Sequence, residues 1–309
     1  MKTLLFSFCF LLALTYPSFS QNRVTDSSAT CIAFWSKNDN RVYKITHSKA
    51  KFDQRAGKSV TESNYEAHLK VIDSSATGFT IEWTYRNFAM SGAAQHSLNS
   101  LETIMEGLKF VYKTDEVGMF TELINWEEVR DFAFSNYEKA IAGKSQNSEF
   151  VVALNQVKSI FKSKENIEAI LIKEVQLFHA PFGREYNRKA EVFETELPNV
   201  TGGAPFPATI TISLDELNVQ QDSIRISINQ TIDKGKAGPI IADILKKLSV
   251  APIKDEAEMK KQVKDMEISD INQYSVTLSS GWINRIYFKR TSNIGPMKQI
   301  ESYLISRIK

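Results

Sequence analysis

Histidines are the first residues to weigh for chemistry, since imidazole binds metals and exchanges protons near neutral pH. The chain contains His47, His68, His96 and His179. No two of them have the i, i+2 or i, i+4 spacing that puts two ligands on one face of a strand or helix. We therefore expect no metal site. His179 follows an apolar run, where a basic side chain suits a helix C-terminus without any catalytic role.

Sequence motifs for nucleophiles and phosphates are also missing. The chain has no H-E-x-x-H, G-x-S-x-G or P-loop sequence, and no G-x-G-x-x-G that opens a helix. Its Gly202-Gly203 pair is followed by two prolines, which prevents a helix from starting over a phosphate. We predict no catalytic residues and no cofactor. A secreted hydrolase with two distant carboxylates, which a sequence cannot pair, is the alternative.

Residues 1–20 have the pattern of a secretory signal peptide. Lys2 precedes an apolar run from Leu4 to Leu14, which is too short to span a bilayer. Ser18 and Ser20 are small residues at the −3 and −1 positions, so cleavage is expected before Gln21. An uncleaved N-terminal anchor is the alternative. Cleavage predicts a periplasmic or secreted protein without a transmembrane segment in its mature chain.

The mature chain would hold one cysteine, Cys31, and therefore no internal disulfide. Apolar residues follow Cys31 and favour a buried thiol over a reactive group or a dimer link. Lysine and arginine total 38 and aspartate and glutamate 36, a net charge of +2. This balance gives no electrostatic reason to expect a nucleic-acid partner.

The clearest structural signal is a hairpin. Residues 65–71 and 79–85 alternate apolar and polar side chains, and turn-forming residues separate the two runs. Further alternating runs near 191–196, 209–214, 224–228, 274–278 and 283–289 predict more antiparallel strands. The run from Ile300 to Ile308 fits a helix or a strand, and we predict a strand because it continues the series of hairpins.

Helical spacing dominates residues 125–180, where we expect helices over about 125–143, 149–161 and 165–179. Asn125 and Glu128 have the spacing of a capping box. Shorter helices are expected at about 97–107, 240–248 and 254–266. The predicted fold class is α+β, a curved antiparallel β-sheet of hairpins and a meander packed against this helical block. We expect a mobile segment at 21–30 and a single domain over 31–309.

One face of the predicted hairpin is aromatic. It carries Tyr65, Phe79, Trp83 and Tyr85. Such a face is either core, covered by the helices, or the wall of a cavity for an apolar ligand. These four residues are the candidate ligand-binding residues of the sequence, and both interpretations stay open.

Two segments carry a resemblance to known families. They are Gly78-Phe79-Thr80-Ile81-Glu82-Trp83 and the strand that leads into a helix at Thr121 to Arg130. With the signal peptide, they resemble the uncharacterised exported proteins of Bacteroidetes. A looser similarity is to lipoprotein-carrier-like half-barrels, where a curved sheet wraps helices and holds acyl chains. The exported family implies no particular activity. Our hypothesis is a non-enzymatic periplasmic or secreted protein, binding or structural, with an apolar small molecule or a cell-envelope component as its partner.

The signal peptide gives the first testable prediction. Exported protein should begin at Gln21, because Ser18 and Ser20 satisfy the small-residue rule for cleavage. Intact-mass measurement and N-terminal sequencing of the protein from its host check this. Exported protein that still begins with Met1 would show that the segment is an uncleaved anchor.

Overall fold

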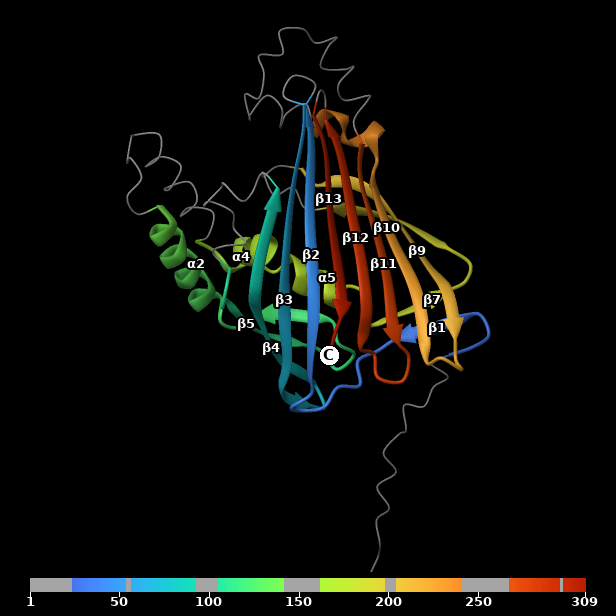
Figure 1. Ribbon diagram of the computed structural model, residues 1–309. Helices are drawn as coiled ribbons and strands as arrows, with labels where there is room; N and C mark the ends of the chain where they lie inside the picture. Colours follow the sequence, from blue (N-terminus) through green and yellow to red (C-terminus); the bar gives the residue numbers. More distant parts are fainter. Residues whose placement is uncertain are drawn as a thin grey trace, which may run out of the picture.

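The computed structural model describes residues 24–53, 57–92, 105–141, 162–197, 204–240, 267–294 and 297–309 (Figure 1). The strands are β1 (Ser28–Cys31), β2 (Asn40–Asp53), β3 (Gly57–Ser75), β4 (Gly78–Gly92), β5 (Lys109–Thr114), β6 (Phe120–Leu123), β7 (Arg184–Asn187), β8 (Glu191–Leu197), β9 (Phe206–Asn218), β10 (Ser223–Ile232), β11 (Glu267–Thr277), β12 (Ile283–Ile294) and β13 (Met297–Arg307). The helices are α2 (Trp126–Ile141), α4 (Lys164–Leu171) and α5 (Lys173–His179). Residues 234–240 are also helical.

Eleven strands form one sheet in the order β6-β5-β4-β3-β2-β13-β12-β11-β10-β9-β8. All of its pairings are antiparallel, and nearly all join strands that follow each other along the chain. The exception is the central pair β2–β13, which joins the two ends of the chain and lies side by side in the ribbon diagram (Figure 1). β1 and β7 form a separate antiparallel pair.

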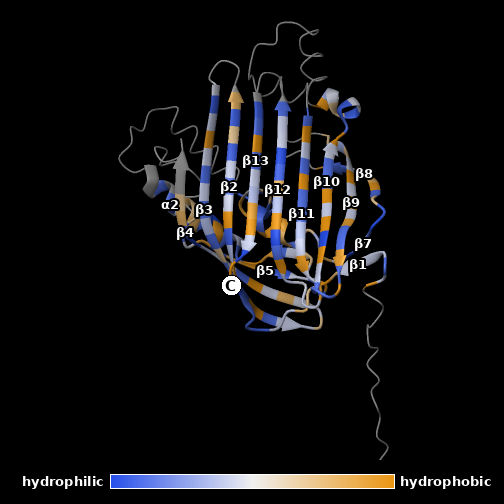
Figure 2. Cartoon of the chain, turned by 45° about the vertical axis from the view of Figure 1, so that its right-hand side comes forward, coloured by the Kyte–Doolittle hydropathy of each residue, from blue (hydrophilic) through white to orange (hydrophobic). Residues whose placement is uncertain are grey.

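The large sheet has two unlike faces. We call the side that carries α5 and the β1–β7 pair the inner face, and the other side the outer face (Figure 1). Along β3, Tyr65, Ala67, Leu69 and Val71 are buried, and the residues between them are more exposed. This period of two places one set of side chains on each face, and the hydropathy bands along the strands follow it (Figure 2).

The hairpin predicted at 65–85 is confirmed, with Leu69 opposite Trp83 and Val71 opposite Ile81. The strand predicted at the C-terminus is confirmed as β13. The segment 21–30, expected to be mobile, contains the start of β1 at Ser28.

The predicted α+β class, with a sheet packed against a helical block at 125–180, is wrong. The described chain is mostly β-structure, and eleven of its strands form one large antiparallel sheet. Strand β2 has 14 residues and β3 has 19, well beyond the alternating runs in the sequence. Polar residues lie on both faces in residues 46–53 of β2 and 57–64 of β3. The period-two pattern of the sequence is therefore lost there, although the strands continue.

Helix expectations were met in part. The helix at 125–143 is present as α2, whereas the one at 165–179 is divided into α4 and α5. The division lies at Ile172, whose φ of −111° and ψ of 29° leave the helical region. The helices expected at 149–161 and 254–266 lie outside the described residues, as do most of those at 97–107 and 240–248.

The capping box predicted at Asn125 and Glu128 does not form. Asn125 Oδ1 accepts a hydrogen bond of 2.8 Å from the Val111 backbone NH. Its Nδ2 donates to the Lys109 carbonyl at 3.0 Å and to Glu128 Oε2 at 3.3 Å. Asn125 therefore fixes the start of α2 to strand β5 and does not cap the helix's own backbone.

The core between the sheet and α5 is aromatic. Trp35 stacks on Trp282 with centroids 4.7 Å apart. Phe178 of α5 meets Tyr43 edge-on at 5.3 Å and Trp83 at 5.6 Å. Since aromatic rings bury large apolar areas, these contacts attach α5 firmly to the centre of the inner face.

The second prediction tests this packing. Trp83 is 0% exposed. Trp83→Ala should lower the free energy of unfolding by about 3–5 kcal/mol, the usual effect of truncating a core aromatic residue. Urea denaturation measures the change. Phe34→Ala is a matched control because Phe34 is 46% exposed, and it should change stability by less than about 1 kcal/mol. Equal effects of the two variants would contradict a closed core at Trp83.

Candidate functional site

The four aromatic residues singled out in the sequence lie together on the inner face, and all are buried. Tyr65 meets Tyr85 edge-to-face at 5.4 Å, and Phe79 lies 5.3 Å from Trp35. In this part of the sheet their neighbours are protein side chains of the core. Contact between these residues and a ligand stays a prediction.

A buried carboxylate lies beside them. Glu174, in the first turn of α5, accepts hydrogen bonds from the Tyr65 hydroxyl at 2.5 Å and the Tyr85 hydroxyl at 2.9 Å. Burial, reinforced by the negative charge of Glu174, raises the pKa of both tyrosines well above the usual value. Both hydroxyls thus stay protonated and donate, which offsets the cost of burying the carboxylate.

The inner face changes from apolar to charged along the strands, and the strand register shows this as three parallel rows. The first row is Leu214, Ile226, Tyr274, Ile286, Ile305 and Ile45. The second is Ile212, Ile228, Asn272, Phe288, Tyr303 and His47. The third is Phe193, Ile210, Gln230, Asp270, Arg290, Glu301 and Lys49. The third row is apolar on β8 and β9 and charged on the four neighbouring strands β11, β12, β13 and β2.

An ionic network covers the aromatic residues of the second row. Glu301 accepts from Lys173 Nζ at 2.8 Å and from His47 Nε2 at 3.0 Å. Lys173 Nζ also lies 4.5 Å from the ring centroid of Phe288 and 5.0 Å from that of Tyr303. Burial favours a higher pKa for Glu301, but the bonds from His47 and Lys173 outweigh it and hold the pKa well below the usual value. Glu301 is therefore ionised.

A second ion pair lies next to this network. Arg290 binds Asp270 through two hydrogen bonds, Nε to Oδ1 at 2.7 Å and Nη2 to Oδ2 at 2.6 Å. This bidentate geometry raises the pKa of Arg290 above its usual value. The two clusters together lie between the apolar part of the inner face and the end of the strands that carries Asp53 and Met297.

The ends of the third row are more open than its centre. Phe193 on edge strand β8 is 42% exposed, and Arg184 of β7 lies 5.6 Å from its ring, which places the ring on the inner side. At the other end, Lys49 is half-buried, and among the described residues it has no ion-pair partner. An exposed apolar edge and an unpaired cation thus lie along one row.

The three described histidines have separate partners. His179 is buried: its Nδ1 donates to the Gly118 carbonyl at 2.7 Å, and its Nε2 accepts from the Tyr112 hydroxyl at 2.9 Å. His47 belongs to the ionic network, and His68 pairs with Glu66 at 3.0 Å on the outer face. His96 lies outside the described residues. Within the described ranges, no three histidine, cysteine or acidic side chains gather as a metal site would need.

Sequence reasoning missed Glu174, Lys173 and Glu301. The two residues at the start of α5 look like ordinary helix residues in the sequence. Glu301 meets His47 only through the pairing of β13 with β2. Cys31, expected to be buried, is 2% exposed. In the described part of the chain, no helix combines the length and apolar character that crossing a bilayer requires.

Comparisons with known proteins assign no family to the chain. No family model matches the chain, and no curated protein matches it. Among solved structures, one describing lipid–protein interactions in lipovitellin is similar at 9% identity and a TM-score of 0.41. That match covers 89% of this chain and 25% of the other, so the chain spans about a quarter of the lipovitellin length. DynF, from the dynemicin biosynthesis pathway of Micromonospora chersina, is similar at 5% identity and a TM-score of 0.21, covering 91% and 83%.

Both TM-scores lie below 0.5, so the function has to be argued from this chain's own residues. The similarity to lipovitellin is weak. With no matching family model, the resemblance to exported Bacteroidetes proteins stays a prediction.

The third prediction concerns His179. Burial lowers its pKa from 6.5 to about 4. The unfolded chain therefore takes up a proton below pH 6.5, whereas the folded protein does not until about pH 4. The contribution of neutral His179 to stability is complete above pH 6.5. It falls as the pH drops toward 4, by up to about 1.4 kcal/mol per pH unit.

Urea midpoints between pH 7 and pH 4.5 measure this effect. His179→Gln should flatten the decline, whereas His68→Gln, at a histidine of the outer face, should leave it unchanged. A decline that is as steep in His179→Gln as in the original protein would contradict the prediction.

Proposed function

We propose that the protein is an exported, non-enzymatic binding protein for an amphipathic small molecule with an apolar chain and an acidic head group. The ligand would lie on the inner face, along and beyond the third row. The observation that carries the proposal is the composition of that row, which runs from exposed Phe193 and half-buried Ile210 to Lys49, a cation without an ion-pair partner in the described part of the chain.

The apolar end supports binding of a hydrocarbon chain. Ile210 and Ile228 are half-buried, and Phe193 extends their surface to the sheet edge. Removing apolar surface from water is favourable by about 25 cal/mol per Å². A chain laid across β8–β10 would cover surface that the described protein leaves partly wet.

The charged end supports an acidic head group. Lys49, Lys173 and Arg290 face two acids, Glu301 and Asp270. Both acids are already paired, with Lys173 and Arg290, so the remaining positive charge is that of Lys49. Lys51 follows two residues later on the same side of β2. A carboxylate or phosphate would be attracted to this end.

The four aromatic residues have a supporting role in this proposal. Tyr65, Phe79, Trp83 and Tyr85 hold α5 through the core, and α5 presents Lys173 to the network. Export rests on the signal-peptide pattern of residues 1–20, which precede the described part. The hydrolase alternative gains no specific support, because the Glu66–His68 pair is the ordinary contact of neighbours two apart on one strand face.

The fourth prediction tests the ligand class. The protein should bind dodecanoate, and dodecylamine of equal chain length should bind more weakly, because the free charge of the site is positive. Fluorescence displacement of a bound fatty-acid probe measures both. Native mass spectrometry of protein purified from its own host should show an added mass.

Matched variants locate the site. Phe193→Ser should weaken dodecanoate binding about fivefold, the equivalent of about 1 kcal/mol of lost apolar contact. Val192→Ser is its control, on the other side of β8 and 65% exposed. Lys49→Gln should weaken dodecanoate but not dodecylamine, and Lys44→Gln on the outer side of β2 should change neither. Absent binding of both compounds, or equal losses in the controls, would overturn the proposal.

A further inference from the structure

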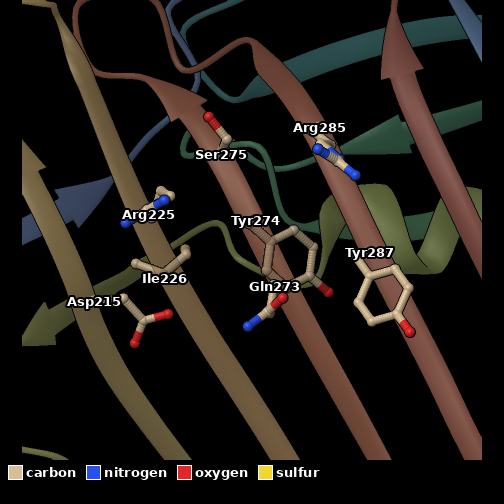
Figure 3. A pocket seen from close by; sticks show the side chains of 8 residues that line it. All are labelled: Asp215, Arg225, Ile226, Gln273, Tyr274, Ser275, Arg285 and Tyr287. Carbon is tan, nitrogen blue, oxygen red and sulfur yellow. The ribbon is translucent and has the colours of Figure 1, made fainter.

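The outer face holds a depression of about 540 Å³ over strands β9 to β12, on the opposite side of the sheet from the proposed inner-face site (Figure 3). Its polar side chains are Asp215, Arg225, Gln273, Ser275, Arg285 and Tyr287. Ile226 and Tyr274 line it from the backbone, since their side chains are buried on the inner face. The sheet backbone therefore forms the floor of the depression, and polar side chains surround it.

Two arginines flank a serine at the centre. The register places Arg225 opposite Ser275 and Ser275 opposite Arg285, on three adjacent strands. The two arginine Cα atoms are thus two strand spacings apart, about 10 Å. Both side chains are long enough to meet over the serine hydroxyl, and Figure 3 shows the three residues on three neighbouring strands, with Ser275 on the middle one.

Both guanidinium groups are accessible to a ligand. Among the described residues Arg285 has no ion-pair partner, and it is exposed. Arg225 pairs with Glu216 at 2.5 Å, but its side chain is 63% exposed. Exposed pairs of this kind contribute little to stability, so Arg225 can exchange its partner at small cost.

An ordered carboxylate limits the ligand class. Asp215 is the extra residue of a β-bulge in β9, because Glu216 pairs with Arg225 and Leu214 pairs with Ile226 on β10. It accepts hydrogen bonds from Ser213 at 2.8 Å and Ser227 at 2.5 Å, which fix its position. A second register shift, at Ser275/Val276, borders the same depression. Bulges re-aim side chains locally, and here two of them shape one site.

We propose that this depression binds an acidic sugar, a saccharide unit that carries one carboxylate or phosphate group. The acidic group lies between Arg225 and Arg285, over Ser275, because a guanidinium binds both kinds of anion through two parallel hydrogen bonds. The sugar hydroxyls bond to Asp215 and Gln273. One ring face lies against the half-exposed ring of Tyr287, which offers an apolar surface with a polar tip.

Two features favour this class over other anions. The fixed negative charge of Asp215 repels densely charged ligands such as nucleic acids, but it accepts hydrogen bonds from hydroxyls. The side chains that face the depression all carry polar or charged groups, so it offers no cavity of aliphatic side chains for the hydrocarbon chain of a lipid. The side chains proposed to contact the sugar all lie on the outer face, so binding there is independent of the function proposed above.

Calorimetric titration of the full-length mature protein at low and moderate salt tests the inference. The probes are tetragalacturonate, glucose 6-phosphate, neutral maltotetraose and inorganic phosphate. We expect at least one of the two acidic sugars to bind more tightly than maltotetraose and inorganic phosphate, and to bind less tightly as salt rises. The one that binds identifies the acidic group as carboxylate or phosphate.

Variants assign the binding to the depression. Arg285→Gln should weaken the acidic sugar about tenfold or more, and Tyr287→Ala should weaken it with little change in salt dependence. Lys289→Gln is the matched control, since it removes the same charge from the outer side of β12 just beyond the depression. Circular dichroism and urea midpoints identify any variant that fails to fold.

Three outcomes would overturn the inference. They are acidic sugars that bind no better than maltotetraose, inorganic phosphate that binds as tightly as the sugars, and a Lys289→Gln loss equal to that of Arg285→Gln. The last would indicate a diffuse surface charge effect in place of a site.

Discussion

The pairing of β2 with β13 is the constraint on which the rest of the structure depends. It joins residues 43–53 to residues 297–307 in one unbroken antiparallel register. Without it the large sheet would be two smaller ones, β2–β6 and β8–β13, each with a long unpaired edge. The Tyr43 hydroxyl donates to the Ile283 carbonyl at 3.0 Å, and the Glu301–His47 bond crosses the same seam. Core and ionic network thus both stabilise the join.

The sequence predicted local structure well and long-range structure poorly. The hairpin at 65–85 could be predicted because each side chain alternates and the turn is short. The length of β2 and β3 could not, because beyond Ile45 and Tyr65 the inner positions become polar and resemble the outer ones. Asn125 was correctly placed at a helix start, but its partner Val111 belongs to a strand that local reasoning does not bring near.

The candidate site was harder to predict, for the same physical reason. The third row of the inner face exists only when seven strands are placed in register, from Phe193 to Lys49. Its members are separated by up to 252 positions of the chain, as for Lys49 and Glu301, which face each other. Sequence reasoning found the aromatic residues, whose spacing is local. It missed the charged residues, because their ion-pair partners lie on other elements of the fold.

Register also decides what each face can bind. Along β12, Arg285 and Tyr287 point outward, whereas Phe288 and Arg290 point inward. A slip of one residue against β11 would exchange these sets, burying charges in the core and exposing Phe288. The bulge at Ser275/Val276 adds one residue to β12 near its start without changing the register of the remainder. The core and the ionic network on the inner face therefore fix the positions of Arg225, Ser275 and Arg285 on the outer face.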